Sequence, residues 1–518
     1  MSHADATATA NGPSSEELIN GLRNPEAYPE AQADDVELHE THISWVFLVG
    51  DFAYKIKKPI RTAFLDYSSL EKRKQFCEQE LRLDRRFAAE LYLDVVPLTW
   101  SGGKPVVEGT GSAVEYAVKM RRFPAGSLLS ERLDAGKLTT DEVFELAQCV
   151  AEFHRSAERL PNDADGKRLG SIDLIYQNAT DNLAALKDAV TGPSAKILRV
   201  LGDWTGTFFE QHRRVFVQRV ANGFIRECHG DMHLANIVHW NDRLIPFDGI
   251  EFNDQFRWID VLSDAAFAAM DFAARDRMDL SHSFINAYLE HTGDHASLVV
   301  LRWYLVYRAM IRAKVAVMRA SQPGLSDSER ATAMQDCEHH IELAYRFSLR
   351  DRPALWITHG VSGSGKTTAS EWVVQRHGAI RLRSDIERKR HFGMQPTDRP
   401  NQRQQRELYC EVANHATYER LRRMARCILR SGHSVVVDAT FLRRDDRQMF
   451  ETLANRESAT FGILNCHAEE QTLRQRISDR IARDDDASDA DLDVLDGQLS
   501  SIEPLSQSEQ NSVVEMSI

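Results

Sequence analysis

The stretch His229–Phe252, HGDMHLANIVHWNDRLIPFDGIEF, carries the arrangement of polar residues from which the first two-thirds of the chain can be interpreted. Asp231 precedes the amide Asn236 by five residues, and a second acid, Asp248, follows Asn236 by twelve residues at the end of an apolar run. Phosphoryl transfer needs an acid that orients an acceptor hydroxyl and hard oxygen ligands that hold Mg²⁺. The pattern H-x-D-x-x-x-x-N followed by an acid therefore predicts a kinase-type centre.

Two other interpretations of this stretch compete with that prediction. His229 and His233 have the i, i+4 spacing of zinc ligands, but this spacing serves a metal on a helix, and Gly230-Asp231 favours a loop. The second alternative is a structural turn capped by Asp231 and Asn236. The joint pattern, which includes the later acid, favours phosphoryl transfer over both.

The segments upstream predict a small lobe built from strands and one helix. Short apolar or alternating runs indicate a hairpin in 43–60, a helix in 70–91, and strands in 94–100 and 113–123. Residues 124–127, Pro-Ala-Gly-Ser, then break the pattern, and the chain becomes mainly helical. This order matches the small lobe of a kinase-like fold, which would contact a nucleotide through a strand lysine and a helix glutamate.

The strand lysine is Lys55 or Lys57, because both lie on one face of a strand with period-two alternation. Lys55 is preferred, since it lies in the more regular part of the strand. The glutamate is Glu78 or Glu80, which point to different faces of the helix, and Glu80 is preferred.

A second candidate site begins near residue 350, where a charged segment with a proline leads into an apolar strand. The sequence GVSGSGKT fits G-x-x-x-x-G-K-[ST] in full, and it follows a strand and opens a helix, as a P-loop requires. Backbone N–H groups would hold phosphate oxygens, while the lysine reaches the β/γ-phosphates and the threonine binds Mg²⁺. The residues are Gly360, Val361, Ser362, Gly363, Ser364, Gly365, Lys366 and Thr367, with Thr368 following.

Polar residues at the ends of later strands indicate a kinase rather than a motor ATPase. Asp385 follows the strand AIRLRS and could orient an acceptor hydroxyl, and Asp438 ends the strand SVVVD, where it could act on Mg²⁺. Either acid could instead cap a helix. Helical spacing places Arg476, Arg480 and Arg483 on one face, which suits a lid over transferring phosphate or a solvated charged helix.

HGDMHLAN followed by PFDGIEF is similar to the aminoglycoside phosphotransferase and choline kinase-like family, which has a bilobal, α+β protein-kinase-like fold. The resemblance covers residues 37–349. It implies an ATP-dependent small-molecule kinase with Asp231 as catalytic base and Asn236 and Asp248 as metal ligands. The chain has no G-x-G-x-x-G loop and nothing like an A-P-E segment, so a protein substrate is disfavoured.

The segments GVSGSGKT, RSD and VVVDAT, with the late arginines, resemble P-loop kinases of the gluconate kinase, polynucleotide kinase and zeta-toxin type. This resemblance covers about 350–500 and predicts an α/β P-loop NTPase domain with a parallel sheet. It implies ATP binding by the P-loop, an acceptor role for Asp385, and lid arginines at Arg476 or Arg480. Fusion of two such domains also resembles a recurrent bacterial protein type.

Bulk properties limit the other classes of function. A length of 518 residues predicts two or three domains, and a net charge of -13 disfavours nonspecific binding to nucleic acid or anionic membranes. Seven scattered cysteines and the lack of an apolar leader or a membrane-length apolar run favour a cytoplasmic enzyme. We expect a disordered or loosely ordered lead in 1–36 that ends in a short helix or turn. The two domains are expected in 37–349 and 350–500, and a flexible tail in 501–518.

The sequence therefore predicts a bifunctional, Mg²⁺- and ATP-dependent phosphotransferase that acts on hydroxyl groups of small molecules. The alternative is an N-terminal pseudokinase scaffold that regulates a C-terminal kinase of a nucleotide, a nucleotide sugar or a nucleic-acid end. The acceptors, the oligomeric state and any communication between the two sites stay open at this level.

Overall fold

The computed structural model describes residues 13–29, 35–62, 65–160, 169–395, 398, 400–483 and 490–516. The chain forms two compact units. Unit 1 comprises Met1–Cys149, Ser156–Ser171 and Asn222–Asp264, and unit 2 comprises Val150–Arg155, Ile172–Ala221 and Ala265–Ile518. The predicted boundary at residue 350 stays a prediction, because compactness groups the preceding helices with the P-loop region.

Unit 1 is built on a six-stranded antiparallel sheet with the order β1-β2-β3-β6-β4-β5. The strands are β1 (Val36–Glu40), β2 (Ser44–Val49), β3 (Phe52–Lys57), β4 (Tyr92–Ser101), β5 (Lys104–Val107) and β6 (Ala113–Arg121). Helix α2 (Leu70–Ala88) packs on β4 and β6, with Cys77 and Ala88 in the shared core. The predicted hairpin and helix are present, while β1 and β5 were not predicted.

Part of the predicted loose lead is folded. Helix α1 (Ser15–Leu22) begins at a capping box between Ser14 and Glu17, and its Leu18 and Leu22 are buried in the core beside the sheet. The short helix η1 (Pro25–Ala27) follows. The short helix expected after the disordered start of the lead is therefore present, and its apolar side chains pack on the core. Residues 1–12 and 30–34 lie outside the described residues.

The stretch 229–252 is flanked by one pair of short strands and contains another. Strand β7 (Ile225–Glu227) pairs with β10 (Trp258–Asp260), and β8 (Ile237–Trp240) forms a hairpin with β9 (Arg243–Pro246). The turn η2 (Leu234–Asn236) leads into the hairpin. The remaining helices are α3 (Leu129–Asp134), α4 (Thr140–Ser156), which continues into unit 2, and α7 (Asp254–Arg257).

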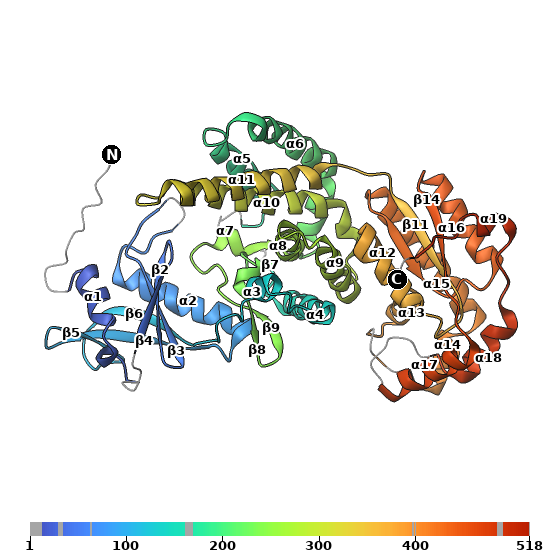
Figure 1. The fold of residues 1–518 in the computed structure, drawn as a ribbon, viewed down its shortest axis with the longest axis horizontal. Coiled ribbons are helices and arrows are strands. Elements are labelled where there is room, and N and C mark those ends of the chain that lie inside the picture. The colour runs from blue at the N-terminus through green and yellow to red at the C-terminus, as the bar shows by residue number, and fades with distance from the viewer. Residues whose placement is uncertain are drawn as a thin grey trace. The chain divides into compact units, whose positions relative to one another are not determined.

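The first part of unit 2 is helical. Helices α10 and α11 lie side by side along their lengths, and α5 and α6 pack against them (Figure 1). Trp303 stands at the centre of an aromatic cluster with Phe209 and Phe216. The elements are α5 (Ile172–Leu186), α6 (Gly192–Ala221), α8 (Val261–Ala274), which begins in unit 1, α9 (Met278–Thr292), η3 (His295–Ser297), α10 (Leu298–Ala320) and α11 (Asp327–Ser348).

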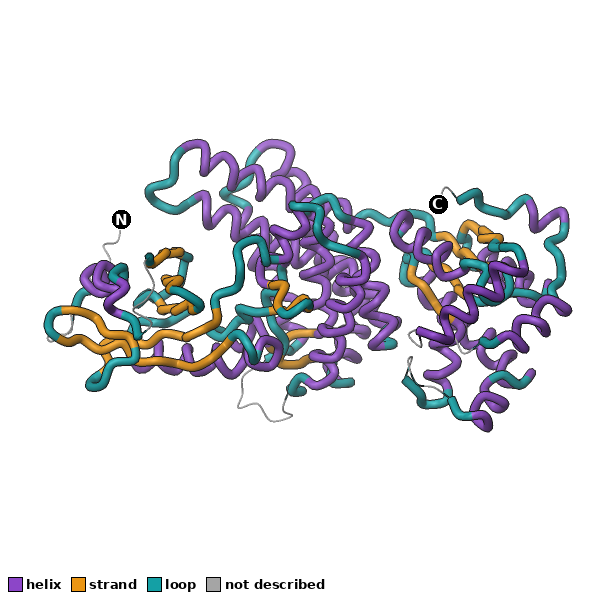
Figure 2. The backbone as a smooth tube through the Cα atoms, turned by 60° about the horizontal axis from the view of Figure 1, so that its bottom comes forward, coloured by secondary structure: helices purple, strands orange, loops and turns teal. Residues whose placement is uncertain are grey.

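The second part of unit 2 holds a parallel sheet with the order β12-β13-β11-β14, flanked by helices (Figure 2). Its strands are β11 (Ala354–His359), β12 (Ile380–Arg383), β13 (Val435–Asp438) and β14 (Thr460–Asn465). The helices are α12 (Lys366–His377), α13 (Ser384–His391), α14 (Gln402–Leu408), α15 (Glu411–Arg430), α16 (Arg444–Arg456), α17 (Glu470–Arg483), α18 (Leu492–Ser501) and α19 (Gln507–Gln510). The predicted α/β fold with a parallel sheet is confirmed.

The predicted flexible tail is folded over residues 501–516. The backbone pairs with the edge strand β14, since Ile463 N–H donates to Ser512 O at 2.8 Å and Val514 N–H donates to Ile463 O at 3.0 Å. Glu509 forms a 2.6 Å ion pair with Arg447, whose guanidinium is fully buried. An edge strand and a buried charge both require partners, and this segment supplies them. Within the described residues, no helix combines the length and apolarity needed to cross a membrane.

Candidate functional site

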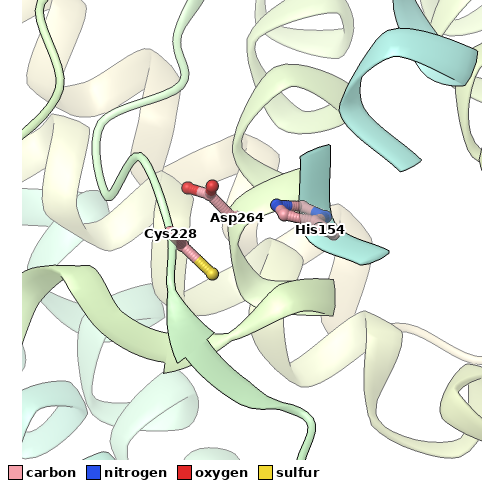
Figure 3. Close-up of side chains that lie close together, drawn as sticks. All are labelled: His154, Cys228 and Asp264. Atoms are coloured by element: carbon pink, nitrogen blue, oxygen red, sulfur yellow. The ribbon is translucent and has the colours of Figure 1, made fainter. Parts of the chain in front are cut away.

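In unit 1, the loop that starts at His229 is held by a buried carboxylate. Asp264 accepts hydrogen bonds from the backbone N–H groups of His229 and Gly230, both at 2.9 Å, and Figure 3 shows this side chain near Cys228. Gly230 has φ +89°, and a Cβ there would lie 2.7 Å from Phe256 O. Only glycine fits this position, which explains the H-G-D sequence.

His229 orients the loop from within. Its Nε2 lies 2.9 Å from Phe247 O and therefore carries the proton, while Nδ1 accepts from Asp231 N–H at 3.2 Å. Burial lowers the pKa of His229, despite the opposing effect of Asp264, so the ring is neutral. Because both ring nitrogens already make hydrogen bonds, the geometry argues against the zinc interpretation.

The candidate base Asp231 is about one-third exposed and is contacted by Asn236. The Asn236 amide nitrogen donates to Asp231 O at 3.0 Å and to the Asp231 carboxylate at 3.3 Å. These bonds assign the amide orientation, in which the Asn236 carbonyl oxygen is the atom that could bind a cation. Asn236 is the last residue of η2, so one helical turn supplies the spacing that the sequence motif shows.

The two candidate lysines on β3 both reach Glu80. Lys55 Nζ lies 2.8 Å from one carboxylate oxygen, and Lys57 Nζ lies 2.6 Å from the other. Lys55 also forms an ion pair with Asp248. Glu78 is exposed and lies 3.7 Å from Lys74, so it takes no part in this cluster.

The charges in this cluster stabilise one another. Burial alone would lower the pKa of Lys55, but Asp248 and Glu80 outweigh it and raise this pKa well above its ordinary value. Burial likewise opposes the ionised form of Glu80, yet the two lysines lower its pKa to about 2. The site is therefore charged and paired rather than neutral.

Contacts that the sequence did not reveal hold the Asp248 turn. Asp248 has φ +61°, a backbone conformation that is costly for a residue with a Cβ. Its N–H donates to the Tyr92 hydroxyl at 3.0 Å, and the Gly249 N–H donates to Asp84 at 2.8 Å. The i, i+4 spacing of Glu80 and Asp84 on α2 was the signal that could have indicated this second contact.

In unit 2, the P-loop has the conformation its glycines predict. Gly360 has φ +148°, and a Cβ there would lie 2.2 Å from Cys466 O. Gly365 has φ +92° and precedes Lys366, the first residue of α12. Lys366 Nζ donates to Val361 O at 2.7 Å, and burial lowers its pKa although Asp438 and Asp385 oppose this.

The P-loop opens into a cavity of about 1320 Å³ at the carboxyl edge of the sheet. Ligands bind at this edge in open α/β folds. The sequence-predicted residues that line it are Ser362, Gly363, Ser364, Gly365, Lys366, Thr367, Thr368, Asp385, Asp438, Arg476 and Arg480.

Each strand-end acid has a defined place in this cavity. Asp385 lies in the first turn of α13, whose N-cap is Arg383 without a side-chain cap bond, so neither Asp385 nor Ser384 is the cap. Asp438 is buried at the end of β13, where its carboxylate accepts from the Ser370 hydroxyl at 3.3 Å. Both acids therefore remain candidates for chemistry rather than capping.

The α17 arginines also face this cavity. Arg476 donates to Gly363 O at 3.1 Å, and Arg480 donates to Ala490 O at 2.6 Å. The Arg483 side chain lies outside the described residues. Sequence reasoning missed Gln498, whose side-chain oxygen accepts from the Ser362 N–H at 2.7 Å and braces the loop from α18.

Both sites offer ligands that suit Mg²⁺, which prefers hard oxygen donors. In unit 2 these are the Thr367 hydroxyl and the Asp438 carboxylate, which line one cavity. In unit 1 they are the Asn236 carbonyl oxygen and the Asp248 carboxylate, about two-fifths exposed. The donor chemistry fits the ion at both places.

Comparisons with known proteins match different parts of the chain. Residues 355–505 match a family described as an AAA domain. An uncharacterized protein of Mycobacterium tuberculosis is 29% identical over 468 residues, which cover 89% of this chain and 90% of that protein. Its similarity therefore extends through both regions.

Solved structures were found for each region separately. A choline/ethanolamine kinase family protein from Mesorhizobium loti is 13% identical. The match covers 64% of this chain and 99% of that protein, with a TM-score of 0.37. A gluconokinase from Sinorhizobium meliloti is 22% identical. The match covers 32% of this chain and 82% of that protein, with a TM-score of 0.21. The family match, the complete P-loop and the cavity identify a P-loop domain in the last part of the chain.

Proposed function

We propose that this protein transfers the γ-phosphate of Mg²⁺-ATP to hydroxyl groups of small molecules at two sites, one in each unit. The observation that carries the proposal is the convergence of Lys366, Asp385, Asp438 and two arginines on one cavity beside the P-loop. A phosphate cradle, an acid for an acceptor and guanidinium groups are the parts that phosphoryl transfer needs.

In unit 2, the P-loop amides and Lys366 would bind the phosphates of ATP, and Arg476 and Arg480 would stabilise charge on the transferring group. Asp385 would orient the acceptor hydroxyl and take its proton as the oxygen–phosphorus bond forms and the bond to ADP breaks. Thr367 and Asp438 would hold Mg²⁺, which neutralises charge on the phosphates.

In unit 1, Asp231 would accept the proton of a second hydroxyl substrate. Asn236 and Asp248 would hold Mg²⁺, and Lys55 would contact the α/β-phosphates while Glu80 orients it. Support comes from the direct contacts of Asn236 with Asp231 and of Lys55 with Glu80. Each acid would accelerate its own reaction by roughly 10²–10⁴-fold, the usual range for a positioned general base.

A screen of hydroxyl metabolites for ATP consumption, run on the full chain and two single-site variants, tests the proposal. Asp231→Asn should abolish turnover of one set of acceptors, and Lys366→Ala should abolish turnover of another. Asp242→Asn is the matched control, because Asp242 is exposed in the β8–β9 turn, where Asn tolerates the same φ of +59°. If neither variant loses any phosphate transfer or ATP hydrolysis, the proposal is wrong.

Two outcomes of this screen would lead to a different proposed function. If nucleotide stabilises unit 1 without any turnover that depends on Asp231, unit 1 is a pseudokinase scaffold that regulates the P-loop site. If Lys366-dependent transfer goes instead to oligonucleotide ends, with binding that weakens steeply as salt rises, the acceptor is nucleic acid.

A further inference from the structure

Unit 1 contains a second buried lysine for which the proposed chemistry has no use. Lys55 and Lys57 point to the same side of β3 and share the two oxygens of Glu80. The Lys55 side chain retains 11% of its exposure, whereas that of Lys57 retains none. Burial of a second ammonium group is costly, so its partners should explain why it is there.

Those partners differ from the partners of Lys55. Lys55 pairs with Asp248, a partly exposed acid at the candidate metal site. Lys57 pairs instead with Glu251, whose side chain is 4% exposed and also accepts a hydrogen bond from the Tyr67 hydroxyl. The Lys57 ammonium lies over the Tyr67 ring, 5.0 Å from its centre. Lys57 is therefore enclosed by protein, where it could not meet a phosphate.

Groups of the sheet and α2 hold the segment from Asp248 to Glu251 at three of its four residues. Tyr92 holds the Asp248 N–H, Asp84 holds the Gly249 N–H, and Lys57 holds the Glu251 carboxylate. The first two bonds restrain backbone, while the third is the ionic anchor at the far end of the segment. Asp248 needs such restraint, because its positive φ is unfavourable in the absence of surrounding contacts.

Because Glu80 pairs with both lysines, the contacts that Lys57 makes do not depend on Lys55. If a phosphate draws the Lys55 ammonium away, Glu80 keeps a buried ion pair with Lys57 at 2.6 Å. The contact between β3 and α2, and the anchor on Glu251, would then persist while Lys55 is engaged. One lysine alone could not serve both purposes, since its ammonium group would have to leave Glu80 unpaired.

We infer that Lys57 is a positioning residue that holds Asp248 in its metal-binding orientation through Glu251, and that Lys55 is the lysine that meets the nucleotide. This assignment rests on the proposed function of unit 1. It separates two lysines that the strand pattern alone leaves equivalent. Groups that orient metal ligands in this way typically change metal affinity by 10–100-fold when they are lost.

The test uses the full chain with Lys366→Ala, which silences the P-loop site, and measures binding of fluorescently labelled ATP as Mg²⁺ is titrated. Lys57→Met should raise the Mg²⁺ concentration for half-maximal binding by about tenfold. Lys55→Met should instead weaken nucleotide binding at every Mg²⁺ concentration. Lys58→Met is the matched control, because Lys58 follows the same strand but pairs with the exposed Glu40 at 2.6 Å, and it should change neither quantity.

A double variant separates positioning from stability. Lys57→Met leaves Glu251 buried without its cation, whereas Lys57→Met with Glu251→Leu replaces the pair by apolar groups and should restore the melting temperature. The Mg²⁺ midpoint should stay raised in the double variant, because the anchor is still missing. If Lys57→Met does not fold, Glu251→Gln takes its place and should shift the midpoint in the same direction.

A wild-type Mg²⁺ midpoint in Lys57→Met, or in Glu251→Gln when that variant replaces it, would overturn the inference. So would restoration of both melting temperature and midpoint in the double variant, which would make Lys57 a purely structural residue. A parent chain that binds no labelled ATP at any Mg²⁺ concentration would refute the proposed function of unit 1, and the role of Lys57 with it.

Discussion

The two candidate sites solve the same problem, a lysine presented to phosphate, by opposite means. In unit 1, Lys55 is fixed by acids from α2 and from the loop after β9, and these raise its pKa. In unit 2, Lys366 is fixed by a backbone carbonyl five residues earlier in its own loop, and burial lowers its pKa. One lysine is held by distant charges, and the other by local backbone.

This difference has consequences for how each site fails. The unit 1 cluster depends on side chains that are far apart in the sequence, so loss of one acid removes part of the charge that balances the buried lysines. The P-loop depends on backbone conformation, so it tolerates changes of distant charges but not the addition of a Cβ at its glycines. Three substitutions test this difference between the two sites, and they follow in order of decreasing expected effect.

Glu80→Ala should have the largest effect. It removes the only acid that contacts both Lys55 and Lys57 among the described residues. Each lysine keeps one other acid, Asp248 or Glu251, so the cost should approach but not exceed the about 3–5 kcal/mol of breaking a buried ion pair outright. Hydrogen exchange of the β3 and α2 amides measures the loss locally. Glu78→Ala, on the exposed face of the same helix, is the control and should change stability by less than about 0.5 kcal/mol. Equal effects at the two positions would contradict the ionic account of unit 1.

Gly360→Ala should have the next largest effect, confined to unit 2. Its φ of +148° excludes a Cβ, and residues held in such conformations cost about 1–3 kcal/mol before the contact with Cys466 O is added. Labelled-ATP binding in a Lys55→Met background should fall together with the melting temperature. Gly202→Ala in α6 should instead raise the melting temperature, because its Cβ would meet no described atom within 4 Å and alanine favours the helix. Unchanged nucleotide binding in Gly360→Ala would show that the loop is not held by its backbone.

A substitution of His433 should have the smallest effect of the three, and it should change stability only in mild acid. Burial lowers the pKa of His433 from 6.5 to about 4, helped by Arg302, and its Nε2 donates to Leu298 O at 3.1 Å. The folded chain therefore binds fewer protons than the unfolded chain below pH 6.5, so stability is complete above that pH and falls toward pH 4. His433→Gln, which cannot titrate, should reduce the loss of stability in unit 2 at pH 5 by about 2 kcal/mol.

Calorimetry at pH 7 and pH 5 measures this change, with the exposed His391→Gln as the control. The Glu80 carboxyl sets a different window in unit 1. Its pKa of about 2 lies below the unfolded value of 4.5, so its contribution is present above that value and is lost only as the pH falls toward 2. If unit 1 unfolded first between pH 6.5 and 5, the proposed separation of the two windows would be wrong.

Local patterns in the sequence were enough to predict the P-loop and the His229–Phe252 stretch. In both, the residues that matter are neighbours along the chain, and glycine is required at Gly230 and Gly360, where a Cβ would meet backbone oxygen. The alternation of strands and helices after residue 350 likewise predicted the parallel sheet. The order of apolar runs before residue 124 predicted most of the antiparallel one.

Tertiary structure decided what depends on residues far apart in the sequence. The period of a strand makes Lys55 and Lys57 equivalent, and only the fold brings Asp248 to one and Glu251 to the other. A composition rich in serine and glutamate suggested a flexible tail, yet Arg447 and the edge of β14 give that segment partners. Short-range patterns determine backbone conformation, whereas pairing of buried charges depends on which distant segments the core brings together.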